Sequence, residues 1–431
     1  MSKKGSEKIS RRFLLKIAGG CAAWLGLNKL PFAHTQASGQ AIQPLPDFTG
    51  PGVNPYWGAV GPFVVYPHKL PLIQLTDRPI QLETPRNYFL TPFTPNAAFY
   101  VRWHLEGIPN AVNLTEWRLF VEGHVEKPLA LSLSDLMKRF KPVSIAAVNQ
   151  CSGNSRSRFQ PRLPGSQWGN GAMGNALFTG VALKDVLNAA GVKTGALQAQ
   201  FEGLEKGRGL TNSVSYKFLK SLKLDNPVIN ETIVAYTMNG EPLPMLNGFP
   251  VRLVVPGKFS TYWIKALTWI RVLTEPDANF WMTKTYCVPD TPGGNITPKD
   301  VKEGHVPMVP VGTMPIRSFI IIPDGSCKIP VEMEVTVRGI AFSGYGTVVK
   351  VELSMDDGAT WGMAKLGEDY GRYSFRTWEA IWVPRHTGKH ILAVRATDEK
   401  GNVQLDDAIW NPKGYLWNKI ERQEVTVDTA G

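Results

Sequence analysis

The C-terminal part of the chain alternates apolar and polar residues over short stretches that are separated by turn residues. Four such stretches follow one another: 331-VEMEVTVRGIAF-342, 348-VVKVELSMDDGATW-361, 376-RTWEAIWVP-384 and 389-KHILAVRATDEKGN-402. Side chains alternate between the two faces of a strand, and Asp357-Gly358 is a typical turn pair. We therefore predict an immunoglobulin-like β-sandwich for residues 308–431.

The central part of the chain combines strand patterns with two helical patterns. Apolar residues recur at helical spacing over Leu133–Phe140 and Leu183–Ala190, and Gly191 suits a helix C-cap. The strand patterns are 118-RLFVEG-123, 143-VSIAAV-148, 251-VRLVVP-256 and 267-LTWIRVL-273. The predicted fold class is therefore α+β, with a mixed α/β domain over residues 38–307 ahead of the sandwich.

Proline and glycine mark the segments between these patterns. The chain has 33 prolines and 41 glycines, which is typical of many turns and few long helices. Residues 38–100 lack helical periodicity, so we expect an extended, wrapping segment with few strands. Residues 276–310 are rich in Pro and Gly and also lack periodicity, so we expect a connector there.

The first residues carry the pattern of an export signal. Ser10-Arg11-Arg12 precedes Leu14-Leu15-Lys16, a weakly apolar stretch and small residues up to Ala37 that suit cleavage. A chance Arg-Arg before an apolar helix is the alternative. We predict a twin-arginine signal peptide over residues 1–37 and export of a folded, cofactor-bearing protein to the periplasm. No later segment has ~18 consecutive apolar residues, so we expect no membrane span in the mature chain.

The net charge of +11 is concentrated at the N-terminus. Residues 1–37 hold seven Lys or Arg residues against Glu7 alone, which leaves +5 for the rest of the chain. The remaining charges are mixed, with no basic run. Proteins that bind nucleic acid cluster their Lys and Arg residues, so this distribution argues against a nucleic-acid partner. A small anionic substrate would need only a modest local cluster of positive charge.

Cysteine usage points to at least one unpaired or ligand-bound thiol. After cleavage Cys151, Cys287 and Cys327 remain, and an odd number cannot pair completely within one chain. The sequence contains no C-x-x-C-H, so we expect no c-type haem in this chain. It also contains no C-x-x-C pair for zinc or iron–sulfur ligation. Cys151 could thus be a buried packing residue, a disulfide partner, a nucleophile or a metal ligand.

Seven separated motifs lie before, around and after Cys151. They read 101-VRWHLEGIP-109, 149-NQCSGNSRSRF-159, 169-GNGAMGNALFTGVALKDVL-187, 248-GFPVRLVVPGKFSTYWIKAL-267, 281-WMTKTY-286, 354-SMDDGATW-361 and 409-IWNPKGY-415. In this order, and over most of residues 90–420, they resemble the sulfite oxidase family of molybdenum enzymes. The resemblance implies a molybdopterin-binding domain of mixed α/β structure, and it makes the C-terminal sandwich the family's dimerisation domain.

The resemblance implies that Cys151 ligates molybdenum, and a soft thiolate suits such a centre. It also implies a catalytic site of Arg102, His104, Arg156 and Tyr286, in which guanidinium groups would bind the sulfite oxyanion. By themselves, Arg102 and His104 would read as a salt-bridged strand arginine and a surface histidine. Tyr286 alone would read equally well as part of an aromatic cluster with a nearby tryptophan.

The cofactor-binding residues that the resemblance implies are Cys151, Ser152, Asn154, Asn247, Arg252 and Lys265. Asn247 departs from the vertebrate enzymes, which carry a histidine that touches the cofactor there. Lys413 stands where animal and plant enzymes have a substrate-site arginine, and lysine lacks the bidentate fork, so we assign it no role. Arg317 reads as an arginine of the domain interface.

The implied activity is the oxidation of sulfite to sulfate at a mononuclear molybdenum-molybdopterin cofactor without an appended nucleotide. Because the chain carries no haem motif, we expect electrons to pass singly to a c-type cytochrome or a cytochrome subunit. A homodimer is the expected assembly. The alternatives are a sulfane dehydrogenase, a methionine sulfoxide reductase, or a non-enzymatic binding module with an inert Cys151.

Overall fold

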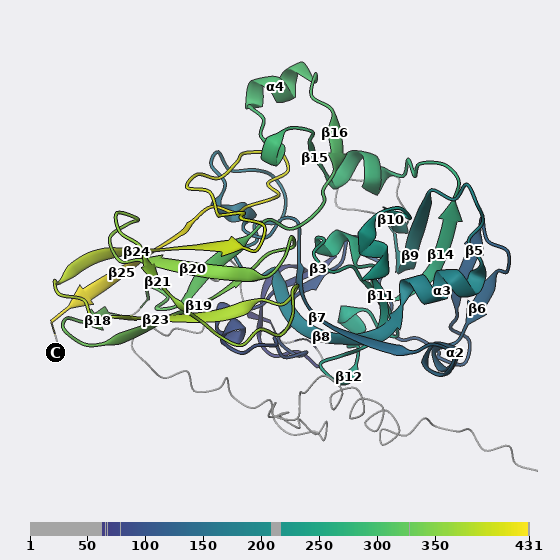
Figure 1. Cartoon of the computed structure of the whole chain (residues 1–431), viewed down its shortest axis with the longest axis horizontal. Helices are drawn as coiled ribbons and strands as arrows, with labels where there is room; N and C mark the ends of the chain where they lie inside the picture. Colours follow the sequence, from purple (N-terminus) through teal and green to yellow (C-terminus); the bar gives the residue numbers. More distant parts are fainter. Residues whose placement is uncertain are drawn as a thin grey trace, which may run out of the picture.

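The computed structural model describes residues 63–64, 66, 68–77, 79–207, 217–326 and 328–429. The predicted signal peptide lies outside these residues, and so does Cys327. Figure 1 shows two β-rich regions side by side: the labelled strands β18 to β21 and β23 to β25 lie in one region, most of the earlier strands lie in the other, and β15 and β16 are drawn above them near α4. None of the helices in the described residues is long and apolar enough to cross a membrane.

The C-terminal region consists of two sheets with a shared apolar core. One sheet has the order β17 (Arg317–Ile322), β19 (Val335–Phe342), β23 (Arg376–Trp382) and β22 (Lys365–Leu366). The other has the order β18 (Lys328–Pro330), β25 (Glu421–Asp428), β24 (Gly388–Asp398), β20 (Val348–Ser354) and β21 (Gly362–Met363). Ile320 and Val337 from the first sheet pack with Val351 and Leu392 from the second. The two packed sheets predicted from the alternation of apolar and polar residues are present, and the assignment of an immunoglobulin-like fold stays a prediction.

The preceding region is built from three larger sheets. The first has the order β10 (Lys217–Lys223), β9 (Gln198–Lys206), β14 (Leu267–Leu273), β5 (Leu119–Gly123) and β6 (Leu129–Leu131). The second has the order β12 (Glu241–Pro242), β11 (Ile233–Met238), β8 (Met173–Ala182) and β7 (Pro142–Gln150), with β13 (Arg252–Val254) also on β11. The third joins β1 (Phe63–Val64), β2 (Leu72–Asp77), β3 (Ile80–Glu83) and β4 (Val101–Arg102). All four strands predicted for this region are confirmed.

Helices are few in the described part of the chain, so the fold is more strongly β than the α+β prediction suggested. Helix α2 (Leu133–Arg139) begins with a capping box between Ser132 and Asp135, and α3 (Leu183–Ala190) ends at Gly191 in a left-handed conformation. Both helices were predicted. The 3-10 helices are Arg86–Leu90, Arg156–Arg158, Pro227–Asn230, Met245–Asn247, Ser260–Tyr262 and Pro292–Gly294.

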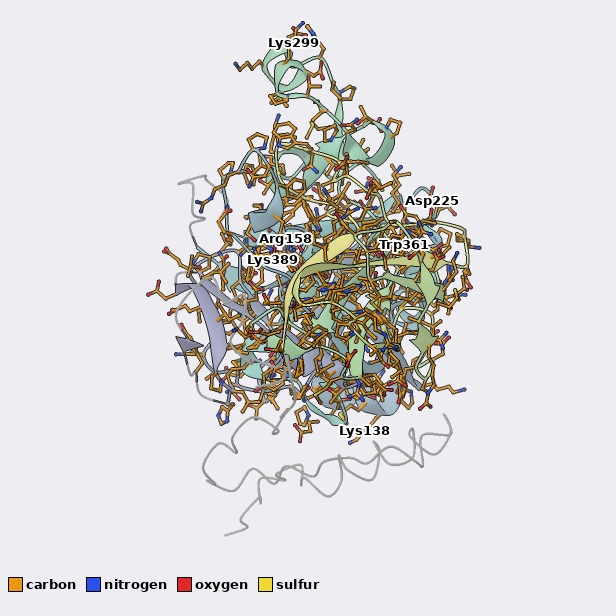
Figure 2. The ribbon with its side chains drawn as sticks, turned by 90° about the vertical axis from the view of Figure 1, so that its left-hand side faces the viewer. Lys138, Arg158, Asp225, Lys299, Trp361 and Lys389 are labelled. Carbon is orange, nitrogen blue, oxygen red and sulfur yellow. The ribbon has the colours of Figure 1, made fainter. Side chains whose placement is uncertain are left out.

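The expected connector over residues 276–310 contains four short elements besides the 3-10 helix Pro292–Gly294. A π-helix covers Trp281–Thr285, and β15 (Cys287–Pro289) pairs with β16 (Met308–Pro310). Helix α4 (Pro298–Glu303) projects from the body in Figure 1, and Lys299 marks it in Figure 2. Elements of three to six residues are too short to produce a readable hydrophobic period, which is why the sequence predicted only a connector.

Strand β20 offers a matched test of the sandwich core. Val351 is fully buried, whereas Val349, two residues earlier, is 52% exposed. We expect Val351→Ala to lower the free energy of unfolding by about 2 kcal/mol, because two buried methyl groups are lost. Val349→Ala should change it by less than about 0.5 kcal/mol. Urea unfolding of both variants measures the difference, and equal effects would contradict this assignment of the core.

Candidate active site

Cys151 lies in the loop that joins the antiparallel strands β7 and β8. Its backbone N–H donates to the carbonyl of Ala172 at 2.9 Å, and its own carbonyl accepts from the N–H of Asn154 at 3.0 Å. The thiol is free and the residue is only 5% exposed. The backbone is thus held on both sides of the sulfur, which places the thiol in a defined position.

Ser152 and Asn154, both predicted to bind a cofactor, differ in how their side chains are used. The Asn154 amide donates to Gln150 at 3.1 Å and accepts from the N–H of Ala172 at 3.0 Å, so its role is to shape the loop. The Ser152 hydroxyl is buried and has no hydrogen-bond partner among the described residues. Because buried polar groups are nearly always paired, Ser152 is the better candidate for contact with a bound group.

Arg102 and Tyr286 meet although they are far apart in the sequence. A terminal nitrogen of Arg102 lies 3.4 Å from the Tyr286 hydroxyl, and the guanidinium also donates to the carbonyl of Trp103. Burial works to lower the pKa of Arg102, but the facing Tyr286 and Cys151 hold that pKa above its ordinary value. Burial raises the pKa of Tyr286, so its phenol stays protonated near neutral pH. The pair can offer a charge and a proton to an oxyanion.

Arg156 also lies close to Tyr286. Its Nε donates to the carbonyl of Lys413 at 3.0 Å, and its guanidinium lies 5.3 Å from the centre of the Tyr415 ring. Tyr415 in turn stacks on Tyr286, with ring centres 5.8 Å apart and planes within 13°. Burial raises the pKa of Tyr415 to about 12, against the opposing charge of Arg156.

Lys413 contributes its backbone to this contact, while its side chain is exposed. Tyr415 was not assigned a role from the sequence, although it ends the motif 409-IWNPKGY-415. That motif was the available signal for it.

His104 lies behind Tyr286. Its ring stacks on Phe218 at 3.5 Å, meets the Tyr286 ring edge-on at 5.5 Å, and places Nδ1 3.3 Å from a carboxylate oxygen of Glu205. Burial and the nearby Arg102 lower the pKa of His104 to about 3, so the ring is neutral near pH 7. Strand β4 ends at Arg102, yet both side chains of the R-x-H motif still contact Tyr286.

The cationic residues predicted to bind the cofactor, Arg252 and Lys265, lie close to each other, and Lys265 interacts electrostatically with Cys151. Arg252 is buried, and both of its hydrogen bonds in the described residues go to backbone carbonyls, of Asn247 at 3.1 Å and of Trp263 at 3.4 Å. Burial lowers the pKa of Arg252 to about 10 and that of Lys265 to about 8. A buried cation with no carboxylate partner is an unfavourable arrangement that a bound anion would relieve.

Asn247 bonds to protein groups through both the oxygen and the nitrogen of its side-chain amide. Its side-chain oxygen accepts from Lys69 at 2.5 Å, and its amide nitrogen donates to the carbonyl of Tyr100 at 3.0 Å. Lys69 is itself buried and also donates to the carbonyls of Asn96 and Phe99, both at 2.9 Å. The amide of Asn247 is thus oriented by protein groups, and its predicted contact with the cofactor stays a prediction. Lys69 lies outside the seven motifs, so no sequence signal pointed to it.

The comparisons with known proteins agree with this arrangement. Residues 105–281 match the oxidoreductase molybdopterin binding domain, and residues 309–428 match the Mo-co oxidoreductase dimerisation domain. The mitochondrial sulfite oxidase of Mus musculus is 33% identical over 392 residues, which cover 87% of this chain and 69% of that protein. The sulfite oxidase of Gallus gallus is 33% identical over 380 residues, which cover 83% and 79%.

This chain belongs to the sulfite oxidase family. Another similar protein, nitrate reductase [NADH] 2 of Arabidopsis thaliana, is 31% identical over 80% of this chain and 40% of that protein. The crystal structure of the sulfane dehydrogenase SoxCD from Paracoccus pantotrophus has a similar fold. It matches with a TM-score of 0.69 and 22% identity, over 94% of this chain and 98% of that one. This chain is a molybdenum oxidoreductase of the family.

The residues around Cys151 fit the family's cofactor. The buried Nε of Arg252 has no hydrogen-bond partner among the described residues, and neither has the hydroxyl of Ser152. Gly248 has φ +112°, and a Cβ there would lie 3.1 Å from Arg252 and 3.2 Å from Lys265. The glycine therefore lets the backbone of Lys265 pack closely against the start of the Arg252 side chain. A thiolate ligand, an unpaired hydroxyl, a buried arginine without a carboxylate partner and a nearby lysine suit a metal cofactor that carries a phosphate.

Lys220 is a further buried cation beside the site, and the sequence did not predict it. Its Nζ donates to the carbonyl of Trp281 at 2.8 Å and lies 5.5 Å from the centre of the Tyr286 ring. Lys220 is fully buried on β10, and burial lowers its pKa to about 7. The strand pattern around Lys220 resembles that of exposed lysines, so no local signal distinguishes it.

Lys220 makes stability depend on pH in a defined direction. The pKa is about 7 in the folded chain and 10.5 in the unfolded chain. Between these values the unfolded chain binds more protons, so stability rises with pH by up to about 1.4 kcal/mol per unit. We expect Lys220→Met to reduce that rise and Lys223→Met, an exposed lysine on the same strand, to leave it unchanged. Urea unfolding at pH 7 and pH 9 measures both, and parallel curves for all three proteins would contradict the burial argument.

Proposed function

We propose that this protein oxidises sulfite to sulfate at a molybdenum cofactor ligated by Cys151. The proposal rests on the convergence of Cys151, Arg102, Arg156 and Tyr286 in one buried site of a chain 33% identical to animal sulfite oxidases. When bound, the cofactor would supply the two-electron redox chemistry and the oxygen transfer. Its phosphate would be held by Arg252 and Lys265.

The protein's own residues would bind and orient the substrate. Sulfite is an anion near neutral pH, so the guanidinium groups of Arg102 and Arg156 would attract it and favour one orientation of its oxygens. Tyr286, whose pKa is raised, would hold a proton at its hydroxyl and donate a hydrogen bond to an oxygen of the substrate. His104 is neutral and would support the Tyr286 ring without adding charge.

The proposal extends to the cellular setting. The Ser10-Arg11-Arg12 pattern supports export of the folded protein to the periplasm. Because the 431 residues contain no C-x-x-C-H sequence, electrons would leave singly to a separate c-type cytochrome or a cytochrome subunit. The match of residues 309–428 to a dimerisation domain supports a homodimer.

The thiol of Cys151 provides the first test. We expect the holoenzyme to reduce cytochrome c when sulfite is added without oxygen, and Cys151→Ser to lose this activity because a metal ligand is removed. Cys287→Ser is the matched control, since Cys287 is also buried and free, and it should retain both molybdenum and activity. Molybdenum in the wild type without a response to sulfite would reject the substrate. Methionine sulfoxide with a reduced donor and a sulfane-bearing substrate would then be tried.

The guanidinium of Arg102 provides the second test. Hydrogen bonds to charged groups contribute about 1.5–3 kcal/mol, so Arg102→Gln should raise the KM for sulfite by about 10- to 100-fold. Arg162→Gln is the control, because Arg162 is exposed in the same loop as Arg156 and contacts only Gln167 in the described residues. Steady-state kinetics at fixed ionic strength measure both. An unchanged KM in Arg102→Gln would show that Arg102 does not bind the substrate.

A further inference from the structure

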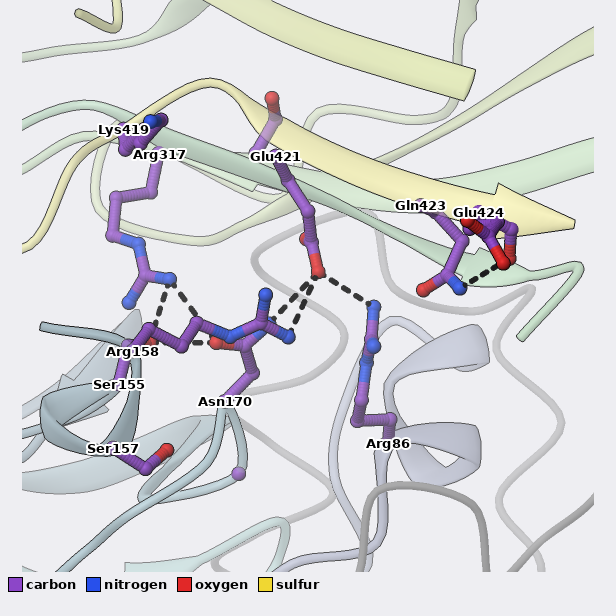
Figure 3. A network of polar contacts seen from close by, with 12 residues as sticks. Arg86, Ser155, Ser157, Arg158, Asn170, Arg317, Lys419, Glu421, Gln423 and Glu424 are labelled. Atoms are coloured by element: carbon purple, nitrogen blue, oxygen red, sulfur yellow. Dashed lines mark hydrogen bonds and ion pairs between the residues drawn. The ribbon is translucent and has the colours of Figure 1, made fainter. Parts of the chain in front are cut away.

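A continuous set of buried polar contacts joins the C-terminal sandwich to the loop that carries Cys151 (Figure 3). Two of its members, Arg317 on β17 and Glu421 on β25, come from the sandwich. The others come from the cofactor-binding region, either from the Cys151 loop or from segments packed on it. The sequence predicted Arg317 only as an arginine of the domain interface, and it gave Glu421 no role.

Arg317 contacts the loop at two points on either side of the cysteine. One terminal nitrogen donates to the side-chain oxygen of Gln150 at 3.2 Å, and the other donates to the hydroxyl of Ser155 at 3.0 Å. Gln150 immediately precedes Cys151, and the same oxygen of Gln150 accepts from Asn154 at 3.1 Å. A single planar guanidinium thus binds both ends of the six-residue segment Gln150–Ser155 around the sulfur.

Glu421 orients this set of contacts from the other sandwich strand. Its carboxylate accepts from the Asn170 amide at 3.1 Å and pairs with Arg86 at 3.3 Å and Arg158 at 3.4 Å. The Asn170 oxygen then accepts from the Ser155 hydroxyl at 2.6 Å. Because Asn170 must donate to Glu421, its oxygen is directed at Ser155. The orientation of the loop therefore follows from the position of a sandwich carboxylate.

Adhesion between the two regions does not require such a network. Burial lowers the pKa of Arg317 to about 9, which shows that its charge is held in an unfavourable environment. Well-packed apolar residues can join two surfaces without the free-energy cost of removing a charge from water. Buried hydrogen bonds are directional, whereas apolar contacts are not. The seam already has backbone contacts for adhesion, since the N–H of Val148 donates to the carbonyl of Tyr373 at 2.8 Å.

We propose that Arg317 is a positioning residue for the metal ligand, and that the C-terminal sandwich thereby sets the geometry of Cys151. The inference rests on the proposed function, because it takes Cys151 as the ligand of the cofactor. Arg317 acts through Gln150 and Ser155, without contact to the substrate. The sandwich has, on this account, a role in each subunit's own site in addition to any role in assembly.

The test compares Arg317→Gln with Arg376→Gln in the holoenzyme. Arg376 lies on β23 of the same sheet as Arg317, and it donates to the carbonyls of Gly367 at 2.6 Å and Val348 at 3.3 Å, within the sandwich. X-ray absorption at the molybdenum edge reports the sulfur ligation of the resting enzyme. We expect Arg317→Gln to alter that ligation and to lower kcat by about 10- to 100-fold, with little change in KM. Arg376→Gln should change neither.

Two outcomes are decisive against the proposal. If Arg317→Gln keeps the sulfur ligation and the kcat of wild type and loses only thermal stability, Arg317 serves only to join the two domains. If Arg317→Gln and Arg376→Gln alter the sulfur ligation and kcat to the same extent, the effect would come from any disturbance of the sandwich and would not be specific to Arg317. The absorption spectrum needs no substrate. If wild type holds molybdenum but ignores sulfite, the proposed substrate fails while the positioning claim is still read from the spectrum.

A second variant covers the case in which Arg317→Gln does not fold. Arg317→Lys keeps the charge but cannot reach Gln150 and Ser155 together. We expect faster hydrogen exchange of backbone amides over residues 150–156 in Arg317→Lys than in wild type, with Arg376→Lys unchanged. This measurement does not depend on the metal. Wild-type exchange over the loop in Arg317→Lys would overturn the proposal.

Discussion

Burying a positive charge is unfavourable unless an anion or several hydrogen-bond acceptors compensate it, and this chain buries several such charges in its cofactor-binding region. Arg252 and Lys69 are almost completely buried and bond to carbonyl or amide oxygens in the described residues. The sheets around Cys151 hold these cations in place by tertiary packing. Lys69 is compensated by three protein oxygens, whereas Arg252 has no carboxylate partner, and an anionic cofactor would compensate its charge.

The framework that supports this charge is a strand pair and a second domain. Strands β7 and β8 bring the Cys151 loop to a defined place, and the backbone carbonyl of Ala172, the residue before β8, accepts a hydrogen bond from the cysteine. The C-terminal region supplies Tyr415 against Tyr286, the carbonyl of Lys413 to Arg156, and Arg317 with Glu421 to the loop. The site is therefore built from both regions, although the cofactor-binding residues come from one.

Much of this site could be predicted from the sequence because its residues lie in separated motifs that keep their order. Cys151, Arg102, Arg156 and Tyr286 were named from those motifs, and the structure brings them together. Four strands of the central region (β5, β7, β13 and β14) and both of its helices followed from hydrophobic period and capping residues, whereas β8 to β11 were not predicted. The short elements after residue 276 did not follow, because three to six residues give no measurable period.

The sequence by itself determined the family, the two-sheet C-terminal region and the residues with the required chemistry, because these depend on local period and on motifs. Only the tertiary structure decided how those residues are used. Burial and the nearby Arg102 keep His104 neutral. Tertiary packing also brings Lys69 to the side chain of Asn247, and it places Lys220 and Tyr415 beside Tyr286. Burial and the identity of a distant partner set these properties, and neither is encoded in the residues adjacent in sequence.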